Sequence, residues 1–154
     1  MDPAAASRLT RKGGSSHEFR ARQLREEILV GVSFVLAMTE AHRAAIVAMS
    51  PKMLKRTYTI AEFAAVLDDL MGAPLTELPH GRTLESRVAR WEMLRTLILL
   101  RRHSTRTRLS RISDIADPYM RGELAFDNMV TALDPLIASI VRFESLCMTP
   151  DTQP

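Results

Sequence analysis

The residues best suited to chemistry are the carboxylates and the aromatic ring of Asp114-Ile115-Ala116-Asp117-Pro118-Tyr119. Pro118 fixes its own φ angle and disfavours the helical conformation at Asp117, so we expect the Asp117 carboxylate on a rigid loop. Tyr119 adds an aromatic ring beside it. An apolar neighbour raises the pKa of a carboxyl group, which allows it to donate a proton near neutral pH. Asp-Pro-Tyr also fits an ordinary turn before a helix, so the tripeptide alone leaves both interpretations open.

Other reactive side chains are few. The single cysteine, Cys147, excludes an internal disulfide and a thiolate metal cluster, and it favours a reducing compartment. The four histidines lack the spacing of metal ligands; they are His17, His42, His80 and His103. We therefore expect no metal ion, no cofactor and a cytoplasmic location.

Length and composition are those of one globular domain. The chain has 154 residues, of which 46% are hydrophobic, and this is enough for a core. The formal net charge of +3 fits attraction to anionic substrates but does not by itself indicate a nucleic-acid partner. No stretch reaches the ~20 apolar residues of a membrane span, and the first residues do not have a signal-peptide pattern, so we expect no membrane partner.

The first half of the chain predicts alternating strands and helices. Residues 32–38 are apolar on both alternating faces, which is typical of a strand covered by helices on both sides. Residues 56–60 predict a second, more polar strand, as at a sheet edge. Thr39, and Thr59 together with Glu62, have the spacing of helix N-caps. The helices expected in this half cover residues 4–12, 24–29, 40–49 and 61–70.

The second half predicts two long helices joined by a basic linker. The first covers residues 84–102, with Trp91 in an apolar stripe that faces the core. Residues 103–111 are rich in Ser, Thr and Arg, and we interpret them as a solvated loop rather than a phosphate-binding patch, because aromatic residues are not interleaved. The last helix is expected over residues 123–143, with a kink at Pro135. The organisation is then one domain, residues 1–148, and a disordered tail, residues 149–154.

The predicted sheet is incomplete. An isolated pair of strands is marginal in water. If strand 32–38 is central, its free edge exposes N–H and C=O groups, which costs stability and favours association. A strand is therefore missing, or another chain supplies it, and a homo-oligomer through this open edge is one way to do so.

Three stretches together resemble the low-molecular-weight protein-tyrosine phosphatases, in particular their bacterial members. They are residues 34–43, 56–63 and 114–119, which read FVLAMTEAHR, RTYTIAEF and DIADPY. The resemblance covers essentially the whole chain, and Asp-Pro-Tyr before the last helix is its most specific part. It implies a three-layer α/β fold with a parallel sheet and helices on both faces. Thioredoxin-coupled arsenate reductases share this fold but are not expected to carry the acid loop.

The resemblance implies hydrolysis of phosphate monoesters through a phosphocysteine. In the family, a Cys-x5-Arg loop after the first strand supplies the nucleophile and holds the phosphoryl oxygens, and the Asp of Asp-Pro-Tyr protonates the leaving phenolate. Carried over to this chain, Asp117 matches the general acid and Tyr119 matches the aromatic wall beside the substrate ring. The implied substrate is a phosphotyrosine protein or a small phosphoester.

The remainder of the family's site has no counterpart here. Cys147 lies near the C-terminus, and the position six residues later, where the loop would need Arg, is Gln153. The first strand, the phosphate loop, the first helix and the second strand are all absent, in agreement with the incomplete sheet. A general acid contributes about 10²- to 10⁴-fold, but only where a nucleophile attacks and fixed donors hold the phosphoryl group. We therefore assign no nucleophile and predict no turnover by this chain alone.

Three interpretations remain open. The chain is the C-terminal portion of a phosphatase, in which case the coding sequence upstream of Met1 encodes a strand and Cys-x5-Arg. Alternatively, it is a non-catalytic binding or regulatory module that completes its sheet with a partner strand. In the third, residues 102–111 contact nucleic acid, which a steep salt dependence of binding would support; we expect no such partner.

Overall fold

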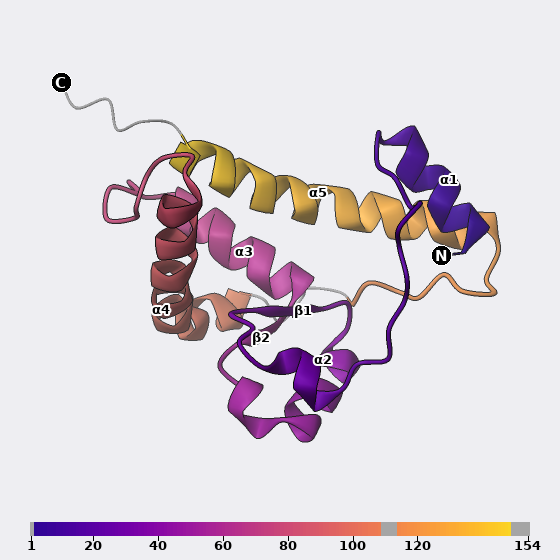
Figure 1. Ribbon diagram of the computed structural model, residues 1–154, viewed down its shortest axis with the longest axis horizontal. Coiled ribbons are helices and arrows are strands. Elements are labelled where there is room, and N and C mark those ends of the chain that lie inside the picture. Colours follow the sequence, from indigo (N-terminus) through magenta and orange to yellow (C-terminus); the bar gives the residue numbers. More distant parts are fainter. Residues whose placement is uncertain (1, 109–113, 149–154) are drawn as a thin grey trace.

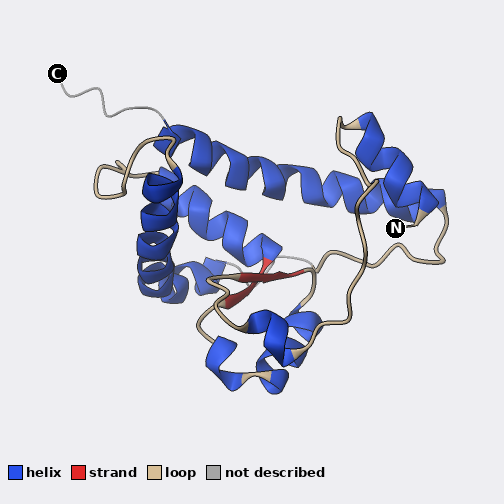
Figure 2. Cartoon of the chain, in the orientation of Figure 1, coloured by secondary structure: helices blue, strands red, loops and turns tan. Residues whose placement is uncertain are grey.

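Helices enclose a small parallel sheet, and the long last helix lies across one side of the molecule (Figures 1 and 2). The structure is a computed structural model that describes residues 2–108 and 114–148. In chain order its elements are α1 (Pro3–Arg11), the 3₁₀ helix η1 (Glu26–Leu29), β1 (Val35–Ala37), α2 (Glu40–Met49), the 3₁₀ helix η2 (Pro51–Met53), β2 (Thr57–Thr59), α3 (Ile60–Met71), α4 (Leu84–Arg108) and α5 (Glu123–Met148). The predicted tail, 149–154, and residues 109–111 of the predicted linker lie outside the described residues.

The two strands pair in parallel, with Val35 opposite Thr57 and Ala37 opposite Thr59. The α/β class and both strand positions are therefore confirmed at this level. The paired segments are shorter than the predicted strands 32–38 and 56–60, because a strand extends only where a neighbour accepts its hydrogen bonds. The Val32 carbonyl, for example, accepts from the Arg56 guanidinium at 3.1 Å instead of from a strand.

Side chains cap the helices that follow the strands. Thr39 Oγ1 accepts from the His42 N–H at 3.0 Å, and Thr59 Oγ1 accepts from the Glu62 N–H at 3.1 Å. These contacts confirm the two N-caps that the sequence predicts. They satisfy N–H groups that have no partner within the helix, and they fix where each helix leaves the sheet.

Two apolar clusters lie on opposite faces of β1. Phe34 packs on the α3 side, within a cluster that includes Tyr58, Phe63 and Trp91. Val35 packs on the other side, with the cluster of Leu29, Ala37, Ile46 and Met53. The alternation of strand side chains explains this division, and Figure 1 shows α3 and α2 on the two sides of the sheet. Helices on both faces and a core position for Trp91 were both predicted.

Both long helices continue beyond their predicted ends. The predicted loop 103–111 is wrong over residues 103–108, which belong to α4. This stretch holds neither Gly nor Pro, so nothing in it prevents the helix from continuing. The last helix extends to Met148 rather than Phe143, and it is continuous through Pro135 (Figure 1).

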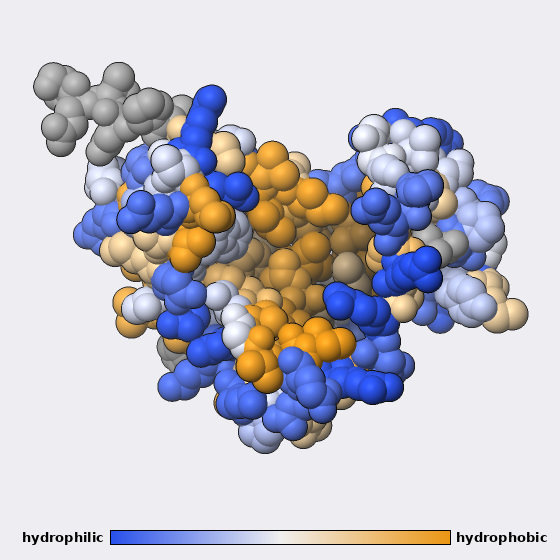
Figure 3. All heavy atoms as spheres, in the orientation of Figure 1, coloured by the Kyte–Doolittle hydropathy of each residue, from blue (hydrophilic) through white to orange (hydrophobic). Residues whose placement is uncertain are grey.

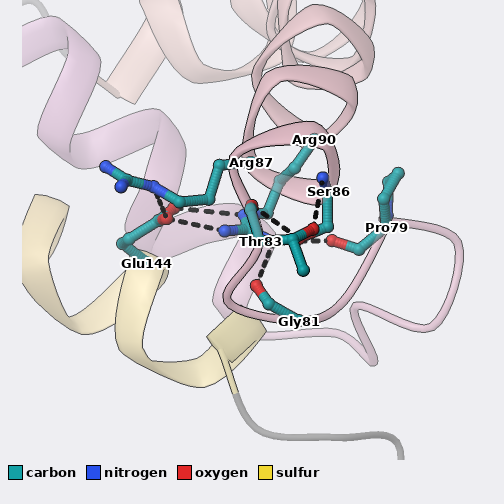
Figure 4. A network of polar contacts seen from close by, with 7 residues as sticks. All are labelled: Pro79, Gly81, Thr83, Ser86, Arg87, Arg90 and Glu144. Atoms are coloured by element: carbon teal, nitrogen blue, oxygen red, sulfur yellow. Dashed lines mark hydrogen bonds and ion pairs between the residues drawn. The ribbon is translucent and has the colours of Figure 1, made fainter.

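A buried arginine joins the second half of the fold (Figure 4). The Arg90 side chain on α4 is fully buried, and its Nη2 and Nε donate to Glu144 of α5 at 2.6 and 3.1 Å. Its Nη1 donates to the carbonyls of Pro79 and Gly81 in the preceding loop, at 2.7 and 3.3 Å. Because each nitrogen of the guanidinium donates at least one hydrogen bond and Glu144 supplies the opposite charge, the arginine can lie in the interior.

Helix α5 carries much apolar surface that the described chain does not cover. By length and composition it is long and apolar enough to cross a membrane, yet only 11% of its most apolar stretch is buried. The sequence did not predict such a segment, because polar and charged residues interrupt the apolar run. Composition of this kind is weak evidence for a membrane span, since core helices share it. The low burial is the more informative property.

Candidate functional site

Two hydrogen bonds hold the Asp117 loop at the carboxyl end of β1. The Ile115 N–H donates to the Met38 carbonyl at 2.9 Å, just beyond the last residue of the strand. Asp114 Oδ1 accepts from the N–H of Glu40, the first residue of α2, at 2.8 Å. A carboxylate at a helix N-terminus is favoured by the helix dipole. Asp114 therefore anchors the loop, and Asp117 follows three residues later.

Asp117 itself forms an Asx turn. Its Oδ1 accepts from the Tyr119 N–H at 3.0 Å, a local bond that fits the ordinary-turn interpretation. The same bond fixes the carboxylate relative to the backbone, and the second oxygen retains capacity to accept or carry a proton. Pro118 is buried, whereas Asp117 is exposed. Within the described residues, no ion pair engages the Asp117 side chain.

Tyr119 is exposed rather than packed into the core. It is 64% exposed, so its ring is free to contact a ligand. The next residue, Met120, has a φ of +59°, a left-handed conformation that costs a side-chain-bearing residue about 1–2 kcal/mol. The Arg121 N–H donates back to the Pro118 carbonyl at 3.0 Å. A tight, strained turn therefore separates Asp117 from the start of α5.

A cavity of about 280 Å³ lies between this loop and the first turns of α5. Polar and apolar side chains share its wall; the lining residues are Asp114, Ala116, Asp117, Pro118, Arg121, Ala125, Asn128, Met129 and Ala132. Asp117, Arg121 and Asn128, which carry a carboxylate, a guanidinium and an amide, thus line one space. Such a set can accept a proton, donate one, or bind an anionic group.

No nucleophile accompanies these groups in the described part of the chain. Cys147 is fully buried near the end of α5, and burial raises the pKa of its thiol, an effect to which Glu144 adds and which Arg90 opposes. A buried thiol with a raised pKa is a poor nucleophile. Within residues 2–108 and 114–148, no group of His, Cys, Asp and Glu is arranged to hold a metal ion.

Part of this arrangement was predicted from the sequence. Asp117 and Tyr119 were both expected at the site, and the structure places them in one turn, but only Asp117 lines the cavity. Arg121 and Asn128 lie beyond the motif and were not predicted. Their signal in the sequence is weak. Arg121 lies two residues after the motif, and Asn128 shares one face of the predicted helix with Ala125 and Ala132.

Comparison with protein families, curated proteins and solved structures found no match to this chain. The resemblance to the low-molecular-weight phosphatases therefore rests on the quoted stretches of sequence alone.

Proposed function

We propose that this chain is the acid-loop portion of a phosphatase of the low-molecular-weight protein-tyrosine phosphatase type. The observation that supports it is the position of Asp117 beyond the carboxyl end of β1, where the bond from Ile115 to Met38 holds its loop. In open α/β sheets, ligands bind beyond the carboxyl ends of the strands. Asp117 is the general acid of this proposal, and Tyr119 contacts the ring of an aryl phosphate such as phosphotyrosine.

The chemistry assigned to Asp117 is protonation of the leaving oxygen. When a thiolate attacks phosphorus, the P–O bond to the phenolate breaks and its electrons leave with the oxygen. A proton from Asp117 neutralises that oxygen, and the carboxylate later accepts a proton from the water that hydrolyses the phosphocysteine. Arg121, in the same cavity, supplies positive charge near the dianionic phosphoryl group.

The chain alone is expected to be inactive. It has one cysteine, which is buried in the wrong part of the fold, and no Cys-x5-Arg sequence. An acid without a nucleophile and without donors for the phosphoryl oxygens cannot turn over substrate.

The experiment is hydrolysis of p-nitrophenyl phosphate at mildly acid pH. Two proteins are compared: the 154-residue chain, and the same chain completed at its N-terminus by the strand, Cys-x5-Arg loop and following helix and strand of an active low-molecular-weight phosphatase. Only the completed chain should turn over, and a Cys→Ser change in the added loop should abolish the reaction. The proposal fails if the short chain hydrolyses the ester, or if a folded completed chain does not.

A further inference from the structure

Helix α5 borders two hollows of different character. Figure 3 shows a broad apolar hollow that extends over α5, α3 and the sheet. The strands and helix that the phosphatase proposal adds at the N-terminus would pack there, because apolar surface of this extent is normally covered. The second hollow is the cavity beside the Asp117 loop, which polar residues line together with apolar ones. Only this second cavity can select a ligand by its charge.

The cavity contains hydrogen-bond donors that the fold does not use. Arg121 and Asn128 both line it, and both are exposed. Within the part of the chain that the structure describes, neither side chain hydrogen-bonds or pairs with another residue. The two carboxylates of the cavity, in contrast, already accept backbone hydrogen bonds: Asp114 from the first residue of α2 at 2.8 Å, and Asp117 from its own turn at 3.0 Å. The cavity therefore favours a ligand that supplies acceptors.

The α5 side of the cavity is mostly apolar. Four residues at three- and four-residue spacing share one face of the helix and line the cavity, namely Ala125, Asn128, Met129 and Ala132. Asn128 is the only polar residue among them. The cavity has a volume of about 280 Å³, which suits a single side chain better than a large cofactor. A fitting ligand therefore has a short apolar stem that ends in an acceptor.

A carboxylate suits Arg121 better than other acceptors do. A guanidinium binds a carboxylate through two parallel, charge-assisted hydrogen bonds. A neutral amide could accept the same bonds but would lack the attraction between opposite charges. A dianionic phosphate inside the cavity would be repelled by Asp114 and Asp117, which line the same space, and a carboxylate carries only half of that charge. Glutamate and aspartate side chains, with their CH₂ stems, meet both requirements.

We propose that Arg121 and Asn128 form a carboxylate-binding subsite for an acidic side chain of a polypeptide. The subsite adjoins Asp117, which lines the same cavity. The acidic residue is then a neighbour of the phosphotyrosine in the substrate; this assignment to a substrate rests on the phosphatase proposal, whereas carboxylate binding does not. Arg121 and Asn128 act as specificity-determining residues, and no bond is made or broken at either of them.

Peptide binding tests the subsite in the full 154-residue chain. The ¹⁵N-labelled chain is titrated at neutral pH with a blocked Ala-Glu-Ala peptide and with Ala-Gln-Ala. The glutamate peptide is expected to shift the side-chain amide signal of Asn128 and to bind about tenfold more tightly. Arg121→Gln should remove this difference. Arg25→Gln is the matched control, because it changes the net charge equally at an exposed arginine that does not line the cavity, and it should keep the difference.

Three results would overturn the subsite. The first is equal binding of the two peptides by the wild-type chain, which includes no binding of either. The second is an equal effect of Arg121→Gln and Arg25→Gln, which would show a general effect of net charge. The third is tighter binding of inorganic phosphate than of the glutamate peptide at the same signals, which would identify the cavity as a phosphate site.

Phosphotyrosine peptides separate this inference from the phosphatase proposal. In the completed chain, glutamate in at least one of the two positions that flank the phosphotyrosine should raise kcat/KM about tenfold over glutamine. Arg121→Gln should bring that ratio close to one. Equal hydrolysis of the glutamate and glutamine peptides overturns the subsite and leaves the phosphatase proposal intact. If neither peptide is hydrolysed while the 154-residue chain still prefers the glutamate peptide, the phosphatase proposal fails and the carboxylate subsite is supported.

Discussion

Single residues with buried charge hold distant parts of this chain together. Arg90 ties α4 to α5 and to the loop before α4. Arg8 ties α1 to α5 in the same way. Its Nε lies 2.7 Å from the Asp127 carboxylate, and its Nη2 lies 2.7 Å from the Glu123 carboxylate. Its guanidinium also lies 5.4 Å from the centre of the Phe126 ring. Both arginines are nearly or fully inaccessible to solvent, and stability depends on their partners.

Replacing Arg90 by Met is expected to lower the free energy of unfolding by about 3–5 kcal/mol, because Glu144 loses its buried partner and two loop carbonyls lose a donor. Arg87→Met is the matched control. Arg87 contacts the same Glu144 at 3.3 Å, but its side chain is 49% exposed, so its loss should cost less than about 1 kcal/mol. Urea unfolding measures both. An equal fall in the free energy of unfolding for the two variants would contradict the role of Arg90 as the buried partner of Glu144.

The contact between Arg8 and Asp127 predicts a pH dependence. The hydrogen bond from Arg8 lowers the pKa of Asp127 below its ordinary value of 3.8. The resulting stability is complete above the ordinary pKa and is lost as the pH falls through the lower pKa of the folded state. Wild type should therefore exceed Asp127→Asn in stability by a constant amount at neutral pH, and the gap should narrow in strong acid. A stability difference between wild type and Asp127→Asn that stays constant or widens toward low pH would contradict the ion pair between Arg8 and Asp127 as its cause.

At the scale of elements, the loop 114–122 joins the end of one strand to the start of two helices. Its Asp114 accepts from the first residue of α2, and its Ile115 pairs with Met38 after β1. The strained turn at Met120 then directs the chain into α5. The position of this loop therefore depends on the contacts of Asp114 and Ile115 rather than on the Asp117 side chain.

Replacing Asp114 should therefore lower the free energy of unfolding more than replacing Asp117. Asp114→Ala removes the acceptor at the N-terminus of α2 and should lower the free energy of unfolding by about 1–2 kcal/mol. Asp117→Asn keeps an oxygen to accept from Tyr119 and should cost no more than about 0.5 kcal/mol. Thermal or urea unfolding compares the two. If Asp117→Asn is the more destabilising change, Asp117 is a structural residue.

Local interactions explain which elements the sequence could predict. The caps at Thr39 and Thr59 involve residues three apart, so their spacing in the sequence was sufficient to predict them. The strand lengths were not predictable, because they depend on neighbours: β1 pairs only where β2 lies beside it. The end of α4 was missed because polar residues suggested a loop where no helix breaker occurs. The Arg90 network joins residues more than fifty positions apart, and no periodic pattern indicates it.

At the scale of the whole molecule, the Asp117 loop lies between the carboxyl end of β1, where Ile115 bonds Met38, and the first turns of α5, with which it shares a cavity. The small number of predicted strands indicated that β1 would have an unpaired edge. The Asp-Pro-Tyr tripeptide indicated Asp117 as a candidate site residue. The cavity with Arg121 and Asn128 was not predictable, because it forms only when α5 packs beside the loop. We propose that Asp117 acts as a proton donor at this place.

The most direct measurement uses the completed chain and two esters that differ in their leaving group. Phenolate, whose conjugate acid has a pKa of about 10, needs a proton to leave, whereas dinitrophenolate does not. Asp117→Asn should therefore reduce kcat on phenyl phosphate by about 10²- to 10⁴-fold and leave kcat on dinitrophenyl phosphate nearly unchanged. Equal reductions on both esters, or no reduction on phenyl phosphate, would contradict the assignment of Asp117 as the general acid.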